Sequence, residues 1–136
     1  MNRLVRNERG QAMVEFALVM PFLLMLVIAV FEFARAWNVY HAVTDAARLG
    51  ARSAVVADPV TTVDSVYAIV DRALARAAIN PATATTTLTG WRGGTGTPAT
   101  MTIQVPYRFV FLRPFLGWTR AEAGITLRSQ FVMRNE

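Results

Sequence analysis

The sequence contains no cysteine and no lysine, and it has a single histidine, His41. Without cysteine, a disulfide framework and a thiolate metal site are excluded. His41 lies among aromatic and alanine residues, with no carboxylate pair or cysteine at a ligand or triad spacing. The three serines, Ser53, Ser65 and Ser129, lie in no nucleophile motif. We therefore expect that the protein is not an enzyme and that it holds no metal and no cofactor.

Because lysine is absent, arginine supplies all of the positive side-chain charge. Fourteen basic residues against nine acidic ones give a formal net charge of +5 at pH 7. A basic balance is common in proteins that bind nucleic acid or an anionic membrane surface. Here the arginines are scattered along the chain, with no run and no recognition-helix pattern. This distribution favours a solvated basic surface and argues against a nucleic-acid partner.

Apolar residues are abundant and are concentrated near the N-terminus. They make up 54% of the 136 residues, which is high for a soluble protein of this size. The run Ala12–Phe31 has Glu15 as its one charged residue, and as a helix it would be about 30 Å long, the thickness of the hydrocarbon core of a bilayer. Arg3, Arg6 and Arg9 precede it, which predicts a cytoplasmic N-terminus and a C-terminal part on the other side of the membrane.

Glu15 needs a partner if this run lies in lipid. A carboxylate at mid-helix costs on the order of 2.5–3.5 kcal/mol, and less near the membrane edge. If the chain is cut between Gly10 and Gln11, a new α-amino group lies one helical turn before Glu15 and can neutralise it, within one chain or between neighbours. Glycine suits the cut position because a protease needs an extended, uncrowded backbone and glycine has no Cβ.

These residues carry a resemblance. The stretch RGQAMVEF with an apolar helix after it resembles the class III signal of type IV pilins and pseudopilins. Together with Pro21, the exit FEFARAW and the following DAARLGARSAV, it resembles more narrowly the TadE-like family, the minor pseudopilins of the tight-adherence (Flp/Tad, type IVc) pilus. The resemblance covers residues 9–56, about a third of the chain.

The resemblance implies processing and assembly. A prepilin peptidase would cut after Gly10 and remove residues 1–10 as a leader peptide, while Glu15 and Phe16 would take part in subunit assembly. The implied partners are other pilin and pseudopilin subunits and the pilus assembly platform of the inner membrane. The C-terminal head would be periplasmic or extracellular, on an inner-membrane protein or within an adhesive pilus.

Three other interpretations remain open. Ala34-Arg35-Ala36 offers a small-x-small signal peptidase site, which would release a binding domain that starts at Trp37. A single-pass anchor with a ligand-binding outer domain would keep its N-terminus uncut. A pseudopilin of a related secretion apparatus would share the N-terminal motif.

Residues 37–57 are expected to continue the helix outside the membrane. The first charges after the apolar run, Glu32 and Arg35, form an i,i+3 pair that can cancel locally. Trp37 and Tyr40 fall where an interfacial aromatic belt would lie. A small-residue stripe follows, which would let another helix approach closely, either the second helix of the same chain or a pilus subunit. Its members are Ala46, Gly50 and Ala54.

Residues 58–136 are expected to form a small head. Asp58 and Pro59 match a helix N-cap and first position, and the helix would end near Asn80. Its apolar stripe comprises Val63, Val66, Tyr67, Val70, Ala73, Leu74 and Ala77. The threonine-rich stretch 83–89 is a strand candidate, and period-two patterns predict strands at 101–111 and 125–133 that pair antiparallel. Pro106 within the second strand argues for an edge position or a bulge.

Together these patterns predict an α+β, pilin-like lollipop. A long N-terminal helix, transmembrane over 11–36, carries a short second helix and a small antiparallel sheet. A head this small is expected to depend on packing against the long helix. Phe111, Phe115 and Trp118 lie in a segment where large apolar side chains are either a partner surface, the closure of the core, or a contact with the membrane.

Overall fold

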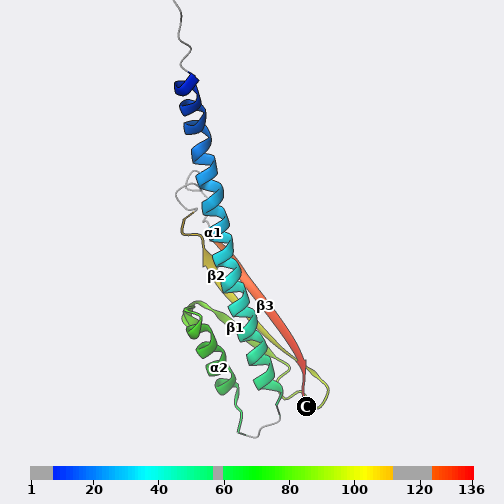
Figure 1. Ribbon diagram of the computed structural model, residues 1–136. Coiled ribbons are helices and arrows are strands. Elements are labelled where there is room, and N and C mark those ends of the chain that lie inside the picture. Colours follow the sequence, from blue (N-terminus) through cyan, green and yellow to red (C-terminus); the bar gives the residue numbers. More distant parts are fainter. Residues whose placement is uncertain (1–7, 57–59, 112–123) are drawn as a thin grey trace, which may run out of the picture.

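The computed structural model describes residues 8–56, 60–111 and 124–136 (Figure 1). One long helix, α1, has its N-terminal part projecting alone, and the other elements lie beside its C-terminal part. The order is α1, α2, a short 3₁₀ helix η1 at Pro81–Thr83, and strands β1, β2 and β3. This arrangement confirms the predicted α+β lollipop, with a stalk and a small head.

Helix α1 spans Glu8–Val55, 48 residues, and is continuous through Pro21. At about 1.5 Å per residue it is roughly 70 Å long. The side chains of residues 11–27 are all exposed, so nothing else in the described chain covers the apolar run. By length and composition this helix is apolar enough to cross a membrane. The structure therefore supports single-pass membrane anchoring.

Helix α2 spans Val63–Arg76 and begins with a capping box. The Thr62 hydroxyl accepts from the Ser65 N–H at 3.2 Å, and the Ser65 hydroxyl accepts from the Thr62 N–H at 3.0 Å. The predicted start at Asp58 and Pro59 lies outside the described residues, but residues 60–62 are not helical and Thr62 is the N-cap, so the helix begins later than predicted. The predicted apolar stripe is confirmed at its centre, where the buried residues are Val66, Val70 and Leu74.

The sheet is an antiparallel meander in the order β1-β2-β3. Its strands span Thr85–Thr89, Pro98–Arg108 and Gly124–Arg134. Leu88, Met101 and Phe131 are paired across the three strands. Alternate β2 side chains are buried, which confirms the predicted period-two face; they are Ala99, Met101, Ile103, Val105 and Tyr107.

Pro106 lies in the central strand but at an edge position within it, which confirms one of the two predicted placements; the other, a bulge, is wrong. The register between β2 and β3 runs without interruption from Pro98 to Arg108. However, β1 reaches only as far as Gln104, so the end of β2 that contains Pro106 has a neighbour on one side only. The absent N–H of Pro106 can face the uncovered side, where no ladder bond is lost.

The core forms where α1 meets α2 and the buried face of the sheet. Its α1 members are Val43 and a run of alanines, and the opposing members come from α2 and β2. Because these alanines are small, the helices and the sheet approach closely without large side chains between them. The head is thus built on the stalk, as expected for so small a unit.

Candidate assembly site on the stalk helix

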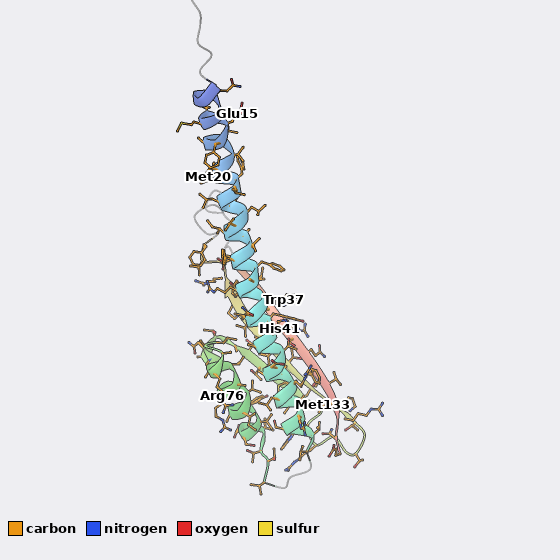
Figure 2. All side chains as sticks on the ribbon, viewed as in Figure 1. Glu15, Met20, Trp37, His41, Arg76 and Met133 are labelled. Atoms are coloured by element: carbon orange, nitrogen blue, oxygen red, sulfur yellow. The ribbon has the colours of Figure 1, made fainter. Side chains whose placement is uncertain are left out.

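Glu15 lies at the end of α1 that is remote from the head (Figure 2). Its carboxylate accepts a hydrogen bond from the Gln11 side-chain amide at 3.1 Å, one helical turn earlier. Large apolar side chains surround this turn and are exposed, among them Met13, Val14 and Phe16. The acid predicted to act in assembly therefore sits on a free apolar helix surface with a neutral partner from its own helix.

The predicted cut site lies within the helix. Because α1 begins at Glu8, both Gly10 and Gln11 belong to its first turn. This differs from the extended backbone expected for a peptidase substrate. The first turn of a helix is held by fewer intrahelical hydrogen bonds than its interior, so this turn opens most readily. Glycine lowers the cost further by about 1 kcal/mol relative to alanine. A cut at the predicted position would require the unwinding of this turn.

The apolar surface of the stalk covers all sides of the helix. Consecutive residues Leu23, Leu24, Met25 and Leu26 are all exposed. A helix that is apolar on every side lies in lipid or among other helices, not in water. This part of α1 can therefore exchange a lipid environment for a helical one without exposing a polar face.

The small-residue stripe faces the interior of the same chain. Ala46, Gly50 and Ala54 are in the core region of α1, and the space at Gly50 is filled from two directions. A Cβ placed on Gly50 would lie 2.6 Å from Val70 Cγ2 and 2.9 Å from Met101 Cε. Two neighbours were expected for this stripe, the second helix of the same chain or a pilus subunit. In the structure, α2 of the same chain packs against it, together with β2.

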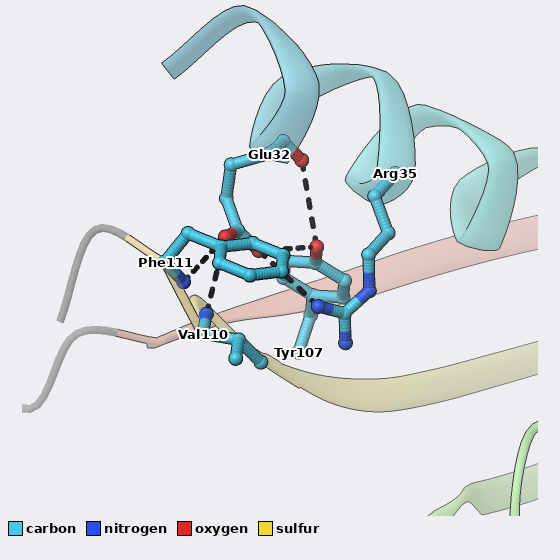
Figure 3. Close-up of polar contacts among 5 residues, drawn as sticks. All are labelled: Glu32, Arg35, Tyr107, Val110 and Phe111. Atoms are coloured by element: carbon cyan, nitrogen blue, oxygen red, sulfur yellow. Dashed lines mark hydrogen bonds and ion pairs between the residues drawn. The ribbon is translucent and has the colours of Figure 1, made fainter. Parts of the chain in front are cut away.

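Glu32 is a buried acid at the junction of stalk and head (Figure 3). Its carboxylate accepts hydrogen bonds from the Phe111 N–H at 2.8 Å, the Val110 N–H at 3.2 Å and the Tyr107 hydroxyl at 2.8 Å. Arg35 lies 3.7 Å from it and places its guanidinium over the Tyr107 ring. A single side chain directly after the apolar run thus holds the end of β2, at Tyr107, and the second and third residues after that strand, Val110 and Phe111.

The environment of this junction also acts on Tyr107. Burial, and the hydrogen bond that its hydroxyl donates to Glu32, raise the pKa of Tyr107 to about 12. Deprotonation would remove that donor and bring a second negative charge beside the carboxylate. Tyr107 therefore stays a neutral hydrogen-bond donor over the whole physiological range.

Sequence patterns did not reveal the junction. They paired Glu32 with Arg35, and that contact exists, but the principal partners lie about 75 residues further along the chain. One signal was available: an acid at the exit of a membrane run and on the buried side of the helix, a turn before Ala36. Such an acid requires hydrogen-bond donors, but the sequence does not say which segment supplies them.

Aromatic side chains form a patch on the exposed side of α1 just past the apolar run. The rings of Phe33, Tyr40 and His41 each contact Trp37, the closest at 5.1 Å between the Trp37 and His41 centroids. Trp37 remains about half exposed. This placement agrees with an interfacial aromatic belt.

The predicted partner surface is only partly described. Phe111 is exposed, next to the Glu32 junction. Phe115 and Trp118 lie outside the described residues. Within residues 8–56, 60–111 and 124–136, no group of histidine and acidic side chains is arranged to hold a metal ion.

Comparison with known proteins identifies the stalk. Residues 10–52 match a family model described as TadE-like protein. The match begins at Gly10 and ends near the C-terminus of α1, so it covers most of this helix and no residue of α2 or the sheet. No curated protein and no solved structure matches the chain.

Proposed function

From a stalk that is TadE-like over residues 10–52, and thus related to the Tad pilus system, we propose that the protein is a minor pseudopilin. It takes part in the assembly of a Tad/Flp type IV pilus for adhesion, by priming or by incorporation. A prepilin peptidase first cuts between Gly10 and Gln11 and removes residues 1–10. The observation that carries the proposal is Glu15, on an uncovered apolar helix one turn after the cut site.

The charge of Glu15 supports this role. The Gln11 amide that contacts it is neutral, so it does not compensate a carboxylate in lipid. Cleavage would place an α-ammonium group on the same residue, Gln11. An ammonium from the same or an adjacent subunit would then neutralise Glu15, and helices that meet in this way would assemble in register.

The remaining partners follow from the position of the stalk. The uncovered apolar half of α1 is available to other pilin and pseudopilin subunits and to the assembly platform of the inner membrane. We propose that the N-terminus is cytoplasmic and that the head is periplasmic or extracellular. The stripe at Gly50 is not available for contacts with other subunits, because it packs the head onto the stalk.

Secretion after cleavage at Ala36 has less support. Ala36 is buried in the middle of continuous α1, and such a cut would remove Glu32 from the head. The Val110 and Phe111 N–H groups would then lose their acceptor. An uncut anchor with a ligand-binding head, or a pseudopilin of a secretion apparatus, gives different results in the experiments that follow.

The first experiment is mass spectrometry of the N-terminus, on protein isolated from membranes of cells with and without the prepilin peptidase. We expect a peptide that begins at Gln11 in the first strain and an N-terminus that includes Met1 in the second. A start at Met1 in both strains would contradict the proposal and support an anchor. A start at Trp37 would support secretion.

The second part of the experiment tests Glu15. Glu15→Gln keeps the size and the hydrogen-bonding capacity of the side chain and removes its charge, while Glu15→Ala removes both. Both variants should be cleaved normally, and both should lower the number of pili per cell at least several-fold by electron microscopy. Asp45→Asn, an exposed acid later in α1, is the matched control and should leave piliation unchanged. Normal piliation with Glu15→Gln would exclude the charge pairing. Loss of a secreted substrate without loss of pili would indicate a secretion apparatus.

A further inference from the structure

We propose that the end of the sheet beside Glu32 is a second membrane-contacting surface, which rests in the lipid headgroup region through Val110, Phe111 and Ile125. This surface would hold the head down on the bilayer next to the point where α1 leaves it. The proposal relies on the membrane anchoring within the proposed function, and it is independent of cleavage and of pilus assembly.

The hydrogen bonds of Glu32 fix the position of this sheet end along α1, and therefore its depth relative to the membrane. Glu32 is the residue directly after the apolar run, and its carboxylate binds the backbone of Val110 and Phe111 at 3.2 and 2.8 Å. The sheet end is therefore within one side-chain length of the residue at which the span ends (Figure 3). The polar layer of a bilayer is about 5–7 Å deep on each side of the hydrocarbon core. A segment at this level lies inside that layer.

The side chains at this level are apolar and uncovered. Val110 and Phe111 are 51% and 56% exposed, and Ile125 is 45% exposed. Ile125 is paired with Tyr107, whose hydroxyl reaches Glu32, so both strands place apolar groups at the same height. Single exposed apolar residues are common, but three at one end of a sheet form a patch that favours an apolar or interfacial environment.

Arginines accompany the apolar side chains. Arg108 is exposed at the end of β2, and Arg35 is half exposed beside Tyr107. Guanidinium groups bind lipid phosphates, with about 1 kcal/mol per arginine close to an anionic surface. Large apolar side chains with arginine around them are typical of segments that lie at a membrane interface.

We assign the bilayer, and not another protein, as the occupant of this surface. The patch is continuous with the apolar run, because Glu32 joins the two. Lipid that covers Phe31 is therefore already beside Val110 and Phe111. Phe33 and Trp37, one and five residues after Glu32 on the exposed surface of α1, stack on each other, so aromatic side chains also lie on the helix where the apolar run ends.

The absence of cysteine makes a direct test possible. Single-cysteine variants of the full chain would carry a nitroxide at Phe111→Cys or Ile125→Cys, in vesicles of phosphatidylcholine and phosphatidylglycerol. Val132→Cys is the matched control, since it is an exposed apolar position on the same strand, about 24 Å from Ile125. Leu24→Cys reports on the span itself. Electron paramagnetic resonance then compares the collision of each label with oxygen, which partitions into lipid, and with a water-soluble nickel chelate.

We expect the oxygen-to-nickel ratio at positions 111 and 125 to be several-fold higher than at position 132, and lower than at position 24. Ratios at 111 and 125 equal to that at 132, with position 24 in lipid, would overturn the proposal and leave the proposed function intact. Shielding of both labels from both reagents would also overturn it, because a protein would then cover the patch. A water-like ratio at position 24 would overturn the membrane anchoring on which both rest.

Discussion

At the scale of single residues, Glu32 joins two segments that are far apart in the sequence, because three of its hydrogen bonds come from the segment 107–111. Its carboxylate accepts hydrogen bonds from Tyr107, Val110 and Phe111, and the side chain is fully buried. Hydrogen bonds to a charged group contribute about 1.5–3 kcal/mol each. A buried carboxylate of this kind is costly to desolvate, and it is stabilising only while all of its donors are in place.

Replacement of Glu32 by glutamine tests this arrangement. The amide oxygen could still accept from the Val110 and Phe111 N–H groups, but the NH₂ would face the Tyr107 hydroxyl, which now donates, and the charge that strengthens all three bonds would be lost. We therefore expect the free energy of unfolding to fall by about 2–4 kcal/mol. The measurement is chemical denaturation of the full chain in detergent micelles, followed by circular dichroism. Tyr107→Phe, which removes one donor only, should cost about 1–2 kcal/mol. Equal stability of Glu32→Gln and the parent chain would exclude a stabilising role for the carboxylate.

A pH dependence follows from Tyr107. Its pKa in the folded head is about 12, against about 10 when unfolded, so the folded state holds this proton more tightly. Its contribution to stability is therefore complete below about pH 10 and is lost as the pH rises through about 12. Absorbance titration near 295 nm should show one tyrosine ionising at about pH 12 together with unfolding of the head. The Tyr107→Phe variant should lack this step, and its persistence there would contradict the assignment.

At the scale of helices and strands, α1, α2 and β2 meet closely at Gly50. Two side chains, one from α2 and one from β2, occupy the place where a Cβ would lie. Alanine at this position gains about 1 kcal/mol of helix propensity but overpacks the core at a cost of about 1–3 kcal/mol. The terminal methyl of Met101 can move aside, whereas the Val70 methyl is fixed close to its backbone.

We therefore expect Gly50→Ala to destabilise the head by about 1–2 kcal/mol, measured by the same denaturation experiment. In a Val70→Ala background the clash is gone, and the same substitution should become neutral or stabilising. The two changes should thus be non-additive by about 1–3 kcal/mol. Additive effects would show that α2 does not set the space at Gly50.

Helices and strands were largely predictable, because each has a period that its own residues display. The α2 stripe and the alternation in β2 give the buried faces directly. The start of α2 was missed, since Asp58-Pro59 and Thr62-Ser65 are both acceptable starts and only the second forms a reciprocal pair. Pro106 has the predicted edge position although β2 is the central strand, because β1 ends opposite Gln104, and the sequence does not show how far β1 extends along β2.

At the scale of the whole molecule, the division into stalk and head followed from composition. An uncovered apolar run and a small head with too little core of its own predict a lollipop, and the head indeed takes part of its core from α1. What could not be predicted is the height of the sheet along the stalk. That height depends on Glu32 and on contacts between segments far apart in the chain, for which no local pattern exists.

Continuity of α1 has a mechanical consequence. The helix is unbroken from Glu8 to Val55, and the head grips it both at Glu32 and around Gly50. Because the head contacts α1 at two positions along its length, rotation about the helix axis and translation along it are both opposed. A displacement of one helical residue is 1.5 Å along the axis and 100° around it. A change in the tilt or rotation of the C-terminal half of α1 therefore moves the head with it, because the helix supplies part of the core of the head.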